Sequence, residues 1–148
     1  MALTTTNIPS VKDAVVEIDL QATPDYTTMT EIQAETISVN VSGGEVATRD
    51  LSAISGDVYS KSGKTASHDI QIQAIFTDGE TADLHPLLEA KKGLDVGISY
   101  SPKGGAAGTR QFRTIGTLYR IDPPSLSGDG DVLYNFALRG AVAGSDAS

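Results

Sequence analysis

The sequence predicts a mainly β protein, a β-sandwich or barrel-like domain with one short flanking α-helix. Over residues 66–140, apolar and polar side chains alternate with a period of two in several short segments, which is typical of strands with one buried face. A single segment, residues 83–92, instead places Leu84, Leu87 and Leu88 on one helical face. A sheet with one helix packed against its edge or face accounts for both patterns.

Six segments carry the strand pattern, with expected bounds of residues 14–20, 32–41, 68–76, 94–101, 110–122 and 131–139. In the third segment, Ile70 and Ile72 alternate with Gln71 and Gln73. One face of this strand is therefore expected in the core and the other in water. In the fifth segment, Gly116 is expected at a bulge or at a close approach of two backbones.

The predicted helix has consistent end signals. Asp83 is expected to cap its first turn, where Pro86 is also tolerated because the missing N–H has no helical partner there. Lys91 and Lys92 lie near the negative end of the helix dipole, and Gly93 follows as the stop.

We expect one domain, residues 13–140, because a chain of 148 residues is long enough to bury a core. Residues 1–12 are Thr-rich and are expected to form an extended arm, and the small residues 141–148 a flexible tail. Residues 42–66 are expected to form a long loop. This loop is too apolar for a linker and is expected to fold over a surface of the chain or of a partner through Val46, Leu51, Ile54, Val58 and Tyr59.

Composition limits the possible functions. The absence of cysteine excludes disulfides, thiolate metal sites and a cysteine nucleophile. Aromatic residues make up 5% of the chain, so a platform for stacking sugars or bases is poorly supplied. The N-terminal residues lack a basic region followed by an apolar core, and no apolar run approaches a membrane span. We therefore expect synthesis in the cytosol and no membrane anchoring.

The net charge of −8 argues against a protein that holds nucleic acid. Such proteins need a basic surface, because Lys and Arg displace the counterions of the phosphates. Here 11 basic residues face 19 acidic ones, and the basic residues are dispersed. Solubility is the simpler explanation of the charge, since a net charge keeps molecules apart.

Two short motifs resemble ligand sites without completing them. Gly63-Lys64-Thr65 matches the end of a phosphate-binding P-loop, but Val58 stands where the first glycine is required. Asp129-Gly130-Asp131 suggests calcium, yet the further oxygen ligands and the final Glu of an EF-hand loop are missing. Both are better explained as surface loops.

No catalytic arrangement is evident, and we expect neither an enzyme nor a cofactor. His68 and His85 are the only histidines, and no Gly-x-Ser-x-Gly elbow accompanies them. Carboxylates for glycoside chemistry are present, but the aromatic residues that would line a sugar cleft are few.

The layout of the chain resembles the major tail tube proteins of long-tailed bacteriophages. Four features carry the resemblance: an arm leading into acidic-faced strand 13–20 and its partner 32–41, the extended loop 42–66, the helix 83–92 after Phe76-Thr77-Asp78-Gly79, and a closing pair of strands within 116–123 and 130–140. Related tubes occur in contractile phage tails and in type VI secretion.

The resemblance implies a structural virion protein without catalytic activity. Members of this family form hexameric rings whose sheets merge into one barrel around a central channel, and the rings stack into a tube. The long loop and the terminal arm reach into the next ring. The implied partners are further copies of the chain, other tail proteins and double-stranded DNA that passes without specific binding. The implied location is the virion tail, after synthesis in the host cytoplasm.

A channel for DNA needs an acidic or neutral lining, because a basic wall would hold the phosphates. The polar strand faces supply candidates for that lining: Asp13, Glu17, Asp19, Asp69, Gln71 and Gln73. The same faces are equally compatible with the outer solvent. Candidates for contacts between rings are the apolar residues of the long loop, Val46, Leu51, Ile54, Val58 and Tyr59.

Other functions stay open at this point. The chain could be another tail component, such as a terminator, or a secretion-tube subunit. A β-sandwich binding module for a receptor or glycan would need aromatic residues clustered on loops, whereas most of the five Tyr and three Phe lie in predicted strands. A small hydrolase using His68 or His85 has the least support.

Overall fold

The computed structural model describes residues 13–53, 56–65, 67–78, 83–104, 109–126, 128 and 130–146. Within these residues the chain forms ten strands and one helix. Their order is β1 (Val15–Asp19), β2 (Thr30–Glu31), β3 (Thr36–Gly43), β4 (Val46–Ala53), β5 (Gly56–Thr65), β6 (His68–Ile75), α1 (Leu84–Ala90), β7 (Asp95–Ser101), β8 (Arg110–Ile121), β9 (Leu133–Gly140) and β10 (Ala143–Asp146).

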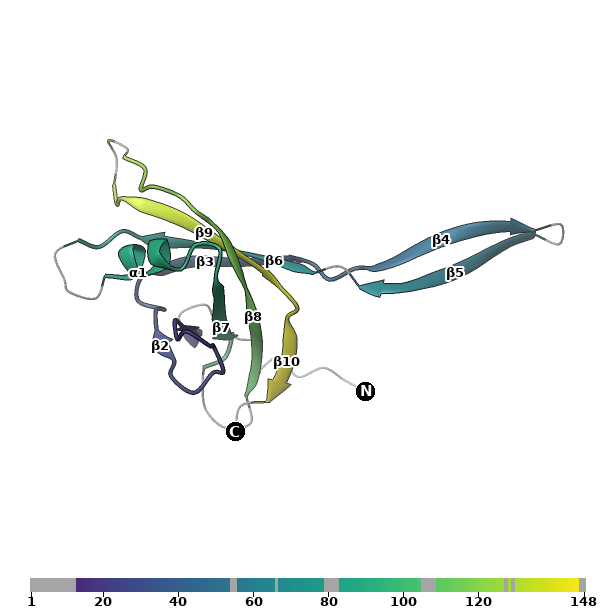
Figure 1. Ribbon diagram of the computed structural model, residues 1–148, viewed down its shortest axis with the longest axis horizontal. Coiled ribbons are helices and arrows are strands. Elements are labelled where there is room, and N and C mark those ends of the chain that lie inside the picture. The colour runs from purple at the N-terminus through teal and green to yellow at the C-terminus, as the bar shows by residue number, and fades with distance from the viewer. Residues whose placement is uncertain are drawn as a thin grey trace.

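One antiparallel sheet dominates the molecule, in the order β2-β1-β7-β8-β9-β6-β3, with β10 paired to β8. The long, bent strands β8 and β9 connect β2, β1 and β7 to β6 and β3 (Figure 1). Side chains from both groups of strands belong to a single core cluster. The predicted mainly β domain with one helix is therefore confirmed.

The core follows the period-two pattern of the strands. The largest fully buried apolar side chains are Tyr134, Phe136, Ile18, Ile70, Ile72, Leu88, Ile98, Leu118, Leu138 and Val96. Helix α1 adds Leu84 and Leu88 to this cluster, whereas Leu87 is 42% exposed. The predicted apolar stripe of the helix is thus narrower than expected.

The N-terminus of α1 differs from its prediction. Asp83 precedes the helix, but its side chain makes no capping hydrogen bond. Its carboxylate instead accepts a hydrogen bond of 3.1 Å from the hydroxyl of Thr77, which ties the end of β6 to the start of the helix. Among the residues that the structure describes, no helix has the length and apolar character to cross a bilayer.

Two further predictions about elements are wrong. The predicted strand 32–41 is interrupted, because the amides of Glu35 and Thr36 both donate to the carbonyl of Ile32 and close a turn between β2 and β3. Residues 141–148 were expected to be a flexible tail, but Ala143–Asp146 forms β10. This strand pairs with the first residues of β8, which β9 does not reach.

The largest difference concerns residues 42–66, which we predicted as a long loop. They contain the antiparallel hairpin of β4 and β5, in which Leu51 pairs with Val58. From here on, the arm means this hairpin, β4 and β5, and not the N-terminal segment 1–12. It projects far from the main sheet (Figure 1), and it continues the β3–β6 pair, whose last partners are Gly43 and His68. Gly43 and Gly44 have φ values of 86° and 77°, which glycine adopts without strain and which redirect the chain into the arm.

The predicted close approach at Gly116 is confirmed. A Cβ atom added there would lie 2.6 Å from the carbonyl oxygen of Arg139 on β9. The irregular pairing of β8 with β9 lies further along, between Leu118 and Arg120.

We expect Gly116→Val to lower the free energy of unfolding by about 2 kcal/mol, the usual scale of overpacking, because the β8 and β9 backbones would have to separate. Urea denaturation measures the change. Gly128→Ala is the control, since a Cβ at Gly128 would meet no atom within 4 Å. Equal stability of the two variants would contradict the close approach.

Candidate functional site

The outward side of β3, β6, β9 and the second half of β8 carries almost only polar side chains. Residues directly opposite each other on paired strands point to the same side of a sheet. The register therefore places Asn40, Gln71, Ala137 and Arg120 in one row, and Ser42, Asp69, Arg139 and Thr117 in the next. We call this surface the polar face, with the residues Ser38, Asn40, Ser42, Asp69, Gln71, Gln73, Thr117, Arg120, Asn135 and Arg139; all are exposed or half-buried.

The first cation of the polar face, Arg120, is paired within the chain. Its Nε and Nη2 atoms donate to the two carboxylate oxygens of Asp122 at 3.0 and 2.8 Å. The hydrogen bonds and the charge of Asp122 raise the pKa of Arg120 above its ordinary value. The guanidinium side chain stays 54% exposed, so the pair lies at the surface.

The second cation, Arg139, has an aromatic and an acidic neighbour. Its guanidinium carbon lies 4.8 Å from the centre of the Tyr119 ring. The hydroxyl of Tyr119 donates to Asp69 at 2.5 Å, and this hydrogen bond raises the pKa of Tyr119. Asp69 is also the direct cross-strand partner of Arg139. Arg120 is thus bound to a carboxylate, and Arg139 has a carboxylate as its cross-strand neighbour.

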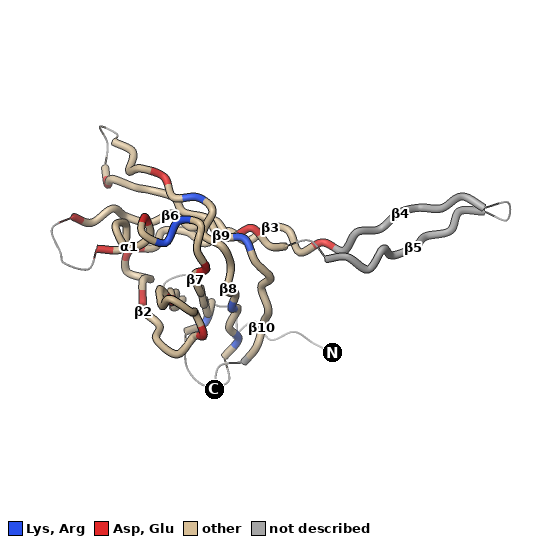
Figure 2. Tube along the Cα trace, viewed as in Figure 1, with Lys and Arg blue, Asp and Glu red and all other residues tan. Residues whose placement is uncertain are grey.

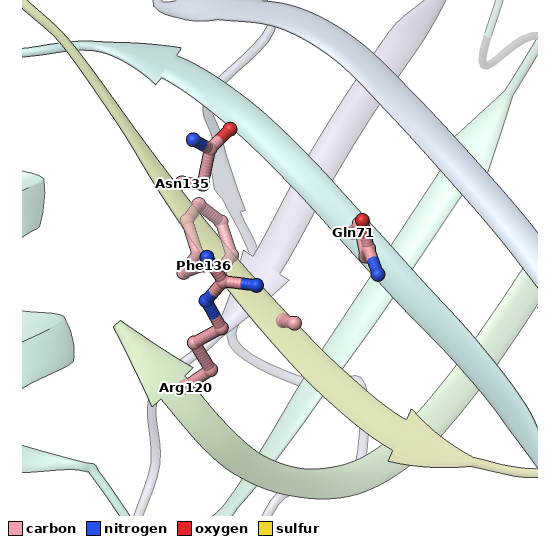
Figure 3. Close-up of a pocket in the computed structure, with 5 residues that line it drawn as sticks. Gln71, Arg120, Asn135 and Phe136 are labelled. Carbon is pink, nitrogen blue, oxygen red and sulfur yellow. The ribbon is translucent and has the colours of Figure 1, made fainter. Parts of the chain in front are cut away.

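A shallow depression of about 150 Å³ lies on the polar face, lined by Gln71, Arg120, Asn135, Phe136 and Ala137 (Figure 3). It forms where the small side chain of Ala137 stands between Gln71 and Arg120 in the row across the strands. Pockets for drug-sized ligands enclose roughly 300–1,000 Å³. This depression is therefore too small to serve as such a pocket.

The six predicted lining residues fall into two groups. Asp69, Gln71 and Gln73 lie together on β6. They alternate with buried apolar residues of the same strand, as the period-two pattern predicts. Asp13, Glu17 and Asp19 lie on or just before β1, which β7, β8 and β9 separate from β6 in the sheet. Glu17 is the direct partner of Glu31 on β2. The structure therefore does not bring the six into one surface.

Asp19 is a clear error of the sequence prediction, because its side chain is fully buried. Its carboxylate accepts four hydrogen bonds of 2.9–3.0 Å, from the backbone and side chain of Gln21 and from the amides of Asp25 and Tyr26. Burial raises the pKa of Asp19, but these hydrogen bonds outweigh it and leave the pKa below its ordinary value. Asp19 organises the loop after β1 and cannot line a channel.

The predicted contacts between rings lie on or near the arm. Val46 and Leu51 belong to β4, and Val58 and Tyr59 to β5. The structure describes the backbone of these four residues but not their side chains, and Ile54 lies outside the described residues. Their role in stacking stays a prediction.

The P-loop hypothesis finds no support in the backbone. Gly63, Lys64 and Thr65 end strand β5, and β6 rather than a helix follows them. A phosphate cradle needs a glycine-rich loop that opens a helix. Of the Asp129-Gly130-Asp131 turn, Asp129 lies outside the described residues. Within the described part of the chain, no three His, Asp or Glu side chains gather into a metal site.

Both histidines hold structural positions. His85 is 6% exposed, with Nε2 3.1 Å from the carbonyl of Asp122 and Nδ1 3.2 Å from the carboxylate of Glu89. His68 Nδ1 accepts the amide proton of Val142 at 3.1 Å, beside the arm. These contacts offer no support for the hydrolase alternative.

Sequence reasoning missed the two ion groups of the polar face. It found the basic residues dispersed and assigned no particular carboxylate partner to Arg120 or Arg139. The irregular pairing between Leu118 and Arg120 changes the alternation of β8 locally, so Arg120 joins the row of Gln71. A single sequence does not reveal such a shift. Figure 2 places the basic residues of the described chain on several elements.

The chain matches no protein-family model and no curated protein sequence. Solved structures, in contrast, match it over nearly its whole length. A chain from the tail of an empty GTA particle, refined with C6 symmetry, has a TM-score of 0.62 and 17% identity, covering 95% of this chain and 100% of that one. The chain therefore has the fold of a component of this tail.

The same fold occurs in contractile systems. A chain of the sheath–tube complex of an extracellular contractile injection system, PVC, has a TM-score of 0.65 and 13% identity, covering 98% of this chain and 99% of that one. A chain of the tube-terminating cap of the anti-feeding prophage, AFP, has a TM-score of 0.68 and 14% identity, covering 99% and 95%. At these identities the likeness is one of fold.

Proposed function

We propose that this protein is the repeating subunit of a phage-like tail tube, which forms hexameric rings that stack around a channel for DNA. The observation that carries the proposal is the match of the whole chain to tail and tube components, one of them in a tail refined with C6 symmetry. The protein then acts in the virion tail with other tail proteins, after synthesis in the host cytoplasm.

The free edge of the sheet supports assembly into closed rings. β3, with eight residues, is the last strand of the sheet order, and no strand of the described chain pairs with its outer side. Such an edge invites uncontrolled pairing unless another chain covers it. Head-to-tail contacts that close into a ring cover every edge at once.

The polar face supports the channel. Of the predicted lining residues, Asp69, Gln71 and Gln73 on β6 belong to this face. Its two arginines are balanced by Asp69 and by Asp122, which pairs with Arg120. A wall of this kind neither concentrates positive charge nor offers apolar surface, so a duplex can slide past it. Asp13 and Glu17 on the β1 side are kept as lesser candidates.

The arm supports stacking, because this hairpin forms a two-stranded sheet of its own, projects from the main sheet and can reach another ring (Figure 1). Residues 1–12 are proposed as a second such contact. The apolar residues of the arm, Val46, Leu51, Val58 and Tyr59, with Ile54 at the turn, would lie in that interface.

A tube terminator is the second candidate, favoured by the likeness to the AFP tube-terminating cap and to the PVC sheath/tube terminator, the latter with a TM-score of 0.65. A terminator closes a tube, whereas a tube subunit stacks on itself.

Negative-stain electron microscopy of the concentrated, purified protein distinguishes these functions. We expect hollow tubes of uniform width and variable length. Single rings that never stack, even after addition of preformed ring fragments, would favour the terminator. Monomers alone under the same conditions would contradict both.

A further inference from the structure

We propose that Asp122 and Asp69 mask the positive charges of Arg120 and Arg139, so that the polar face does not grip the phosphates of duplex DNA. This inference rests on the proposed function, in which the polar face lines the channel. It assigns to the two carboxylates a role in cargo passage.

Arg120 would otherwise be a strong phosphate ligand. Its guanidinium is largely exposed, and a planar guanidinium binds phosphate through two parallel N–H···O bonds. Asp122 occupies that same fork, with both oxygens bound to Nε and Nη2. A phosphate would have to displace the carboxylate before binding.

Arg139 is masked in a different way. The guanidinium lies over the Tyr119 ring, and the hydroxyl of Tyr119 is bound to Asp69, the cross-strand partner of Arg139. The Tyr119–Asp69 bond therefore holds an aromatic face and a negative charge next to this cation. The side-chain amide of Gln71 adds a contact of 3.4 Å to the other oxygen of Asp69.

Folding alone does not account for these pairs. Exposed ion pairs contribute little to stability, because water screens them and ordering the side chains costs entropy. In a tube, however, every copy repeats the same two arginines along the path of the cargo. Each phosphate contact steepens the salt dependence of binding, with a slope of about −0.9 per contact on a logarithmic scale. Small affinities per copy would add up to retention of the DNA.

The test measures binding of a short, fluorescein-labelled DNA duplex to the full-length protein by anisotropy, between about 50 and 200 mM salt. We expect weak binding by the wild type. Asp122→Asn and Asp69→Asn should each tighten it about threefold, and the double variant about tenfold, with a salt slope steeper by about one for each freed arginine. Tyr119→Phe keeps the ring but removes the bond to Asp69, and serves if Asp69→Asn does not fold.

The matched control is Glu31→Gln, which also removes one negative charge but lies on β2, at the edge of the sheet opposite β3. It should change the affinity less than twofold. Adding Arg120→Gln to Asp122→Asn should abolish the gain. The masking role would be overturned if Asp122→Asn and Asp69→Asn raised the DNA affinity no more than Glu31→Gln does. It would also be overturned if the higher affinity of Asp122→Asn persisted after Arg120→Gln was added.

Electron microscopy of the same samples separates this inference from the proposed function. If the Asp122 and Asp69 variants form tubes but bind DNA no more tightly than the wild type, the masking role is overturned and the tube function is unaffected. A gain in DNA binding by protein that never forms tubes would support the masking of the two arginines but count against the tube, and with it against a role in cargo passage.

Discussion

Deletion of residues 45–66 is expected to abolish long tubes while leaving the main sheet folded. The arm accounts for most of this segment, and its strands β4 and β5 pair with each other rather than with the main sheet. Removing it therefore takes away no partner of the core strands. If the arm connects successive rings, the variant should stop at single rings or very short stacks.

The junction of the arm suits such a deletion. Gly43 and His68 are the last partners of the β3–β6 pair, so joining Gly44 to Ser67 leaves a two-residue turn between them. Gly44 already has a φ of 77°, and a positive φ at the first central residue is what tight hairpin turns require. The register of β3 and β6 should survive unchanged.

Two measurements report the outcome. Thermal unfolding should give a melting temperature close to that of the wild type, and electron microscopy should give the distribution of tube lengths. A shorter arm that lacks the pairs Ser52–Asp57 and Ala53–Gly56 but keeps residues 54–55 should give tubes of intermediate length. Full-length tubes from a folded deletion variant would show that stacking does not need the arm.

The sequence predicted what depends on alternation within one strand. On β6, the period of two separated Ile70 and Ile72 from Gln71 and Gln73. This correctly assigned the buried side of the strand to the core and its other side, which carries three of the ten polar-face residues, to the surface. Gly116 was also correctly assigned to a close approach, because a strand interior rarely tolerates glycine without such a reason.

What the sequence could not predict depends on pairing between distant segments. The arm mixes apolar residues with Ser, Thr, Gly and Lys, and its strand pattern is weak without the partner strand. β10 exists because β8 is longer than the part that β9 covers, which no local pattern reveals. By alternation, Asp19 belongs to the face of β1 that was predicted to be exposed to solvent. The loop after β1 folds back over it, however, and buries its side chain.

Replacing Asp19 by asparagine is expected to lower the free energy of unfolding by about 3 kcal/mol, the scale of lost charge-assisted hydrogen bonds in a buried site. The carboxylate accepts four hydrogen bonds from donors on Gln21, Asp25 and Tyr26. Asparagine offers one acceptor oxygen, and its NH₂ group would face N–H donors. Urea denaturation at neutral pH measures the loss.

The lowered pKa of Asp19 determines in which direction its contribution to stability changes with pH. Because the pKa of Asp19 is lower in the folded state than its ordinary value of 3.8, folding favours the charged carboxylate. Its contribution is complete above pH 3.8 and disappears as the pH falls through the lower, folded-state pKa. The stability difference between the wild type and Asp19→Asn should therefore be constant near neutral pH and shrink in acid.

Glu17→Gln is the matched control, since it removes a carboxylate of the same strand. Glu17 stands directly opposite Glu31, and like charges in cross-strand positions repel each other. Its neutralisation should raise stability by about 0.5 kcal/mol. Two variants that each remove one negative charge from β1 are thus expected to shift stability in opposite directions. A loss of similar size in both would mean that the charge of the strand matters rather than the loop around Asp19. A difference that persists undiminished in acid would mean that the ionised form of Asp19 is not what holds that loop.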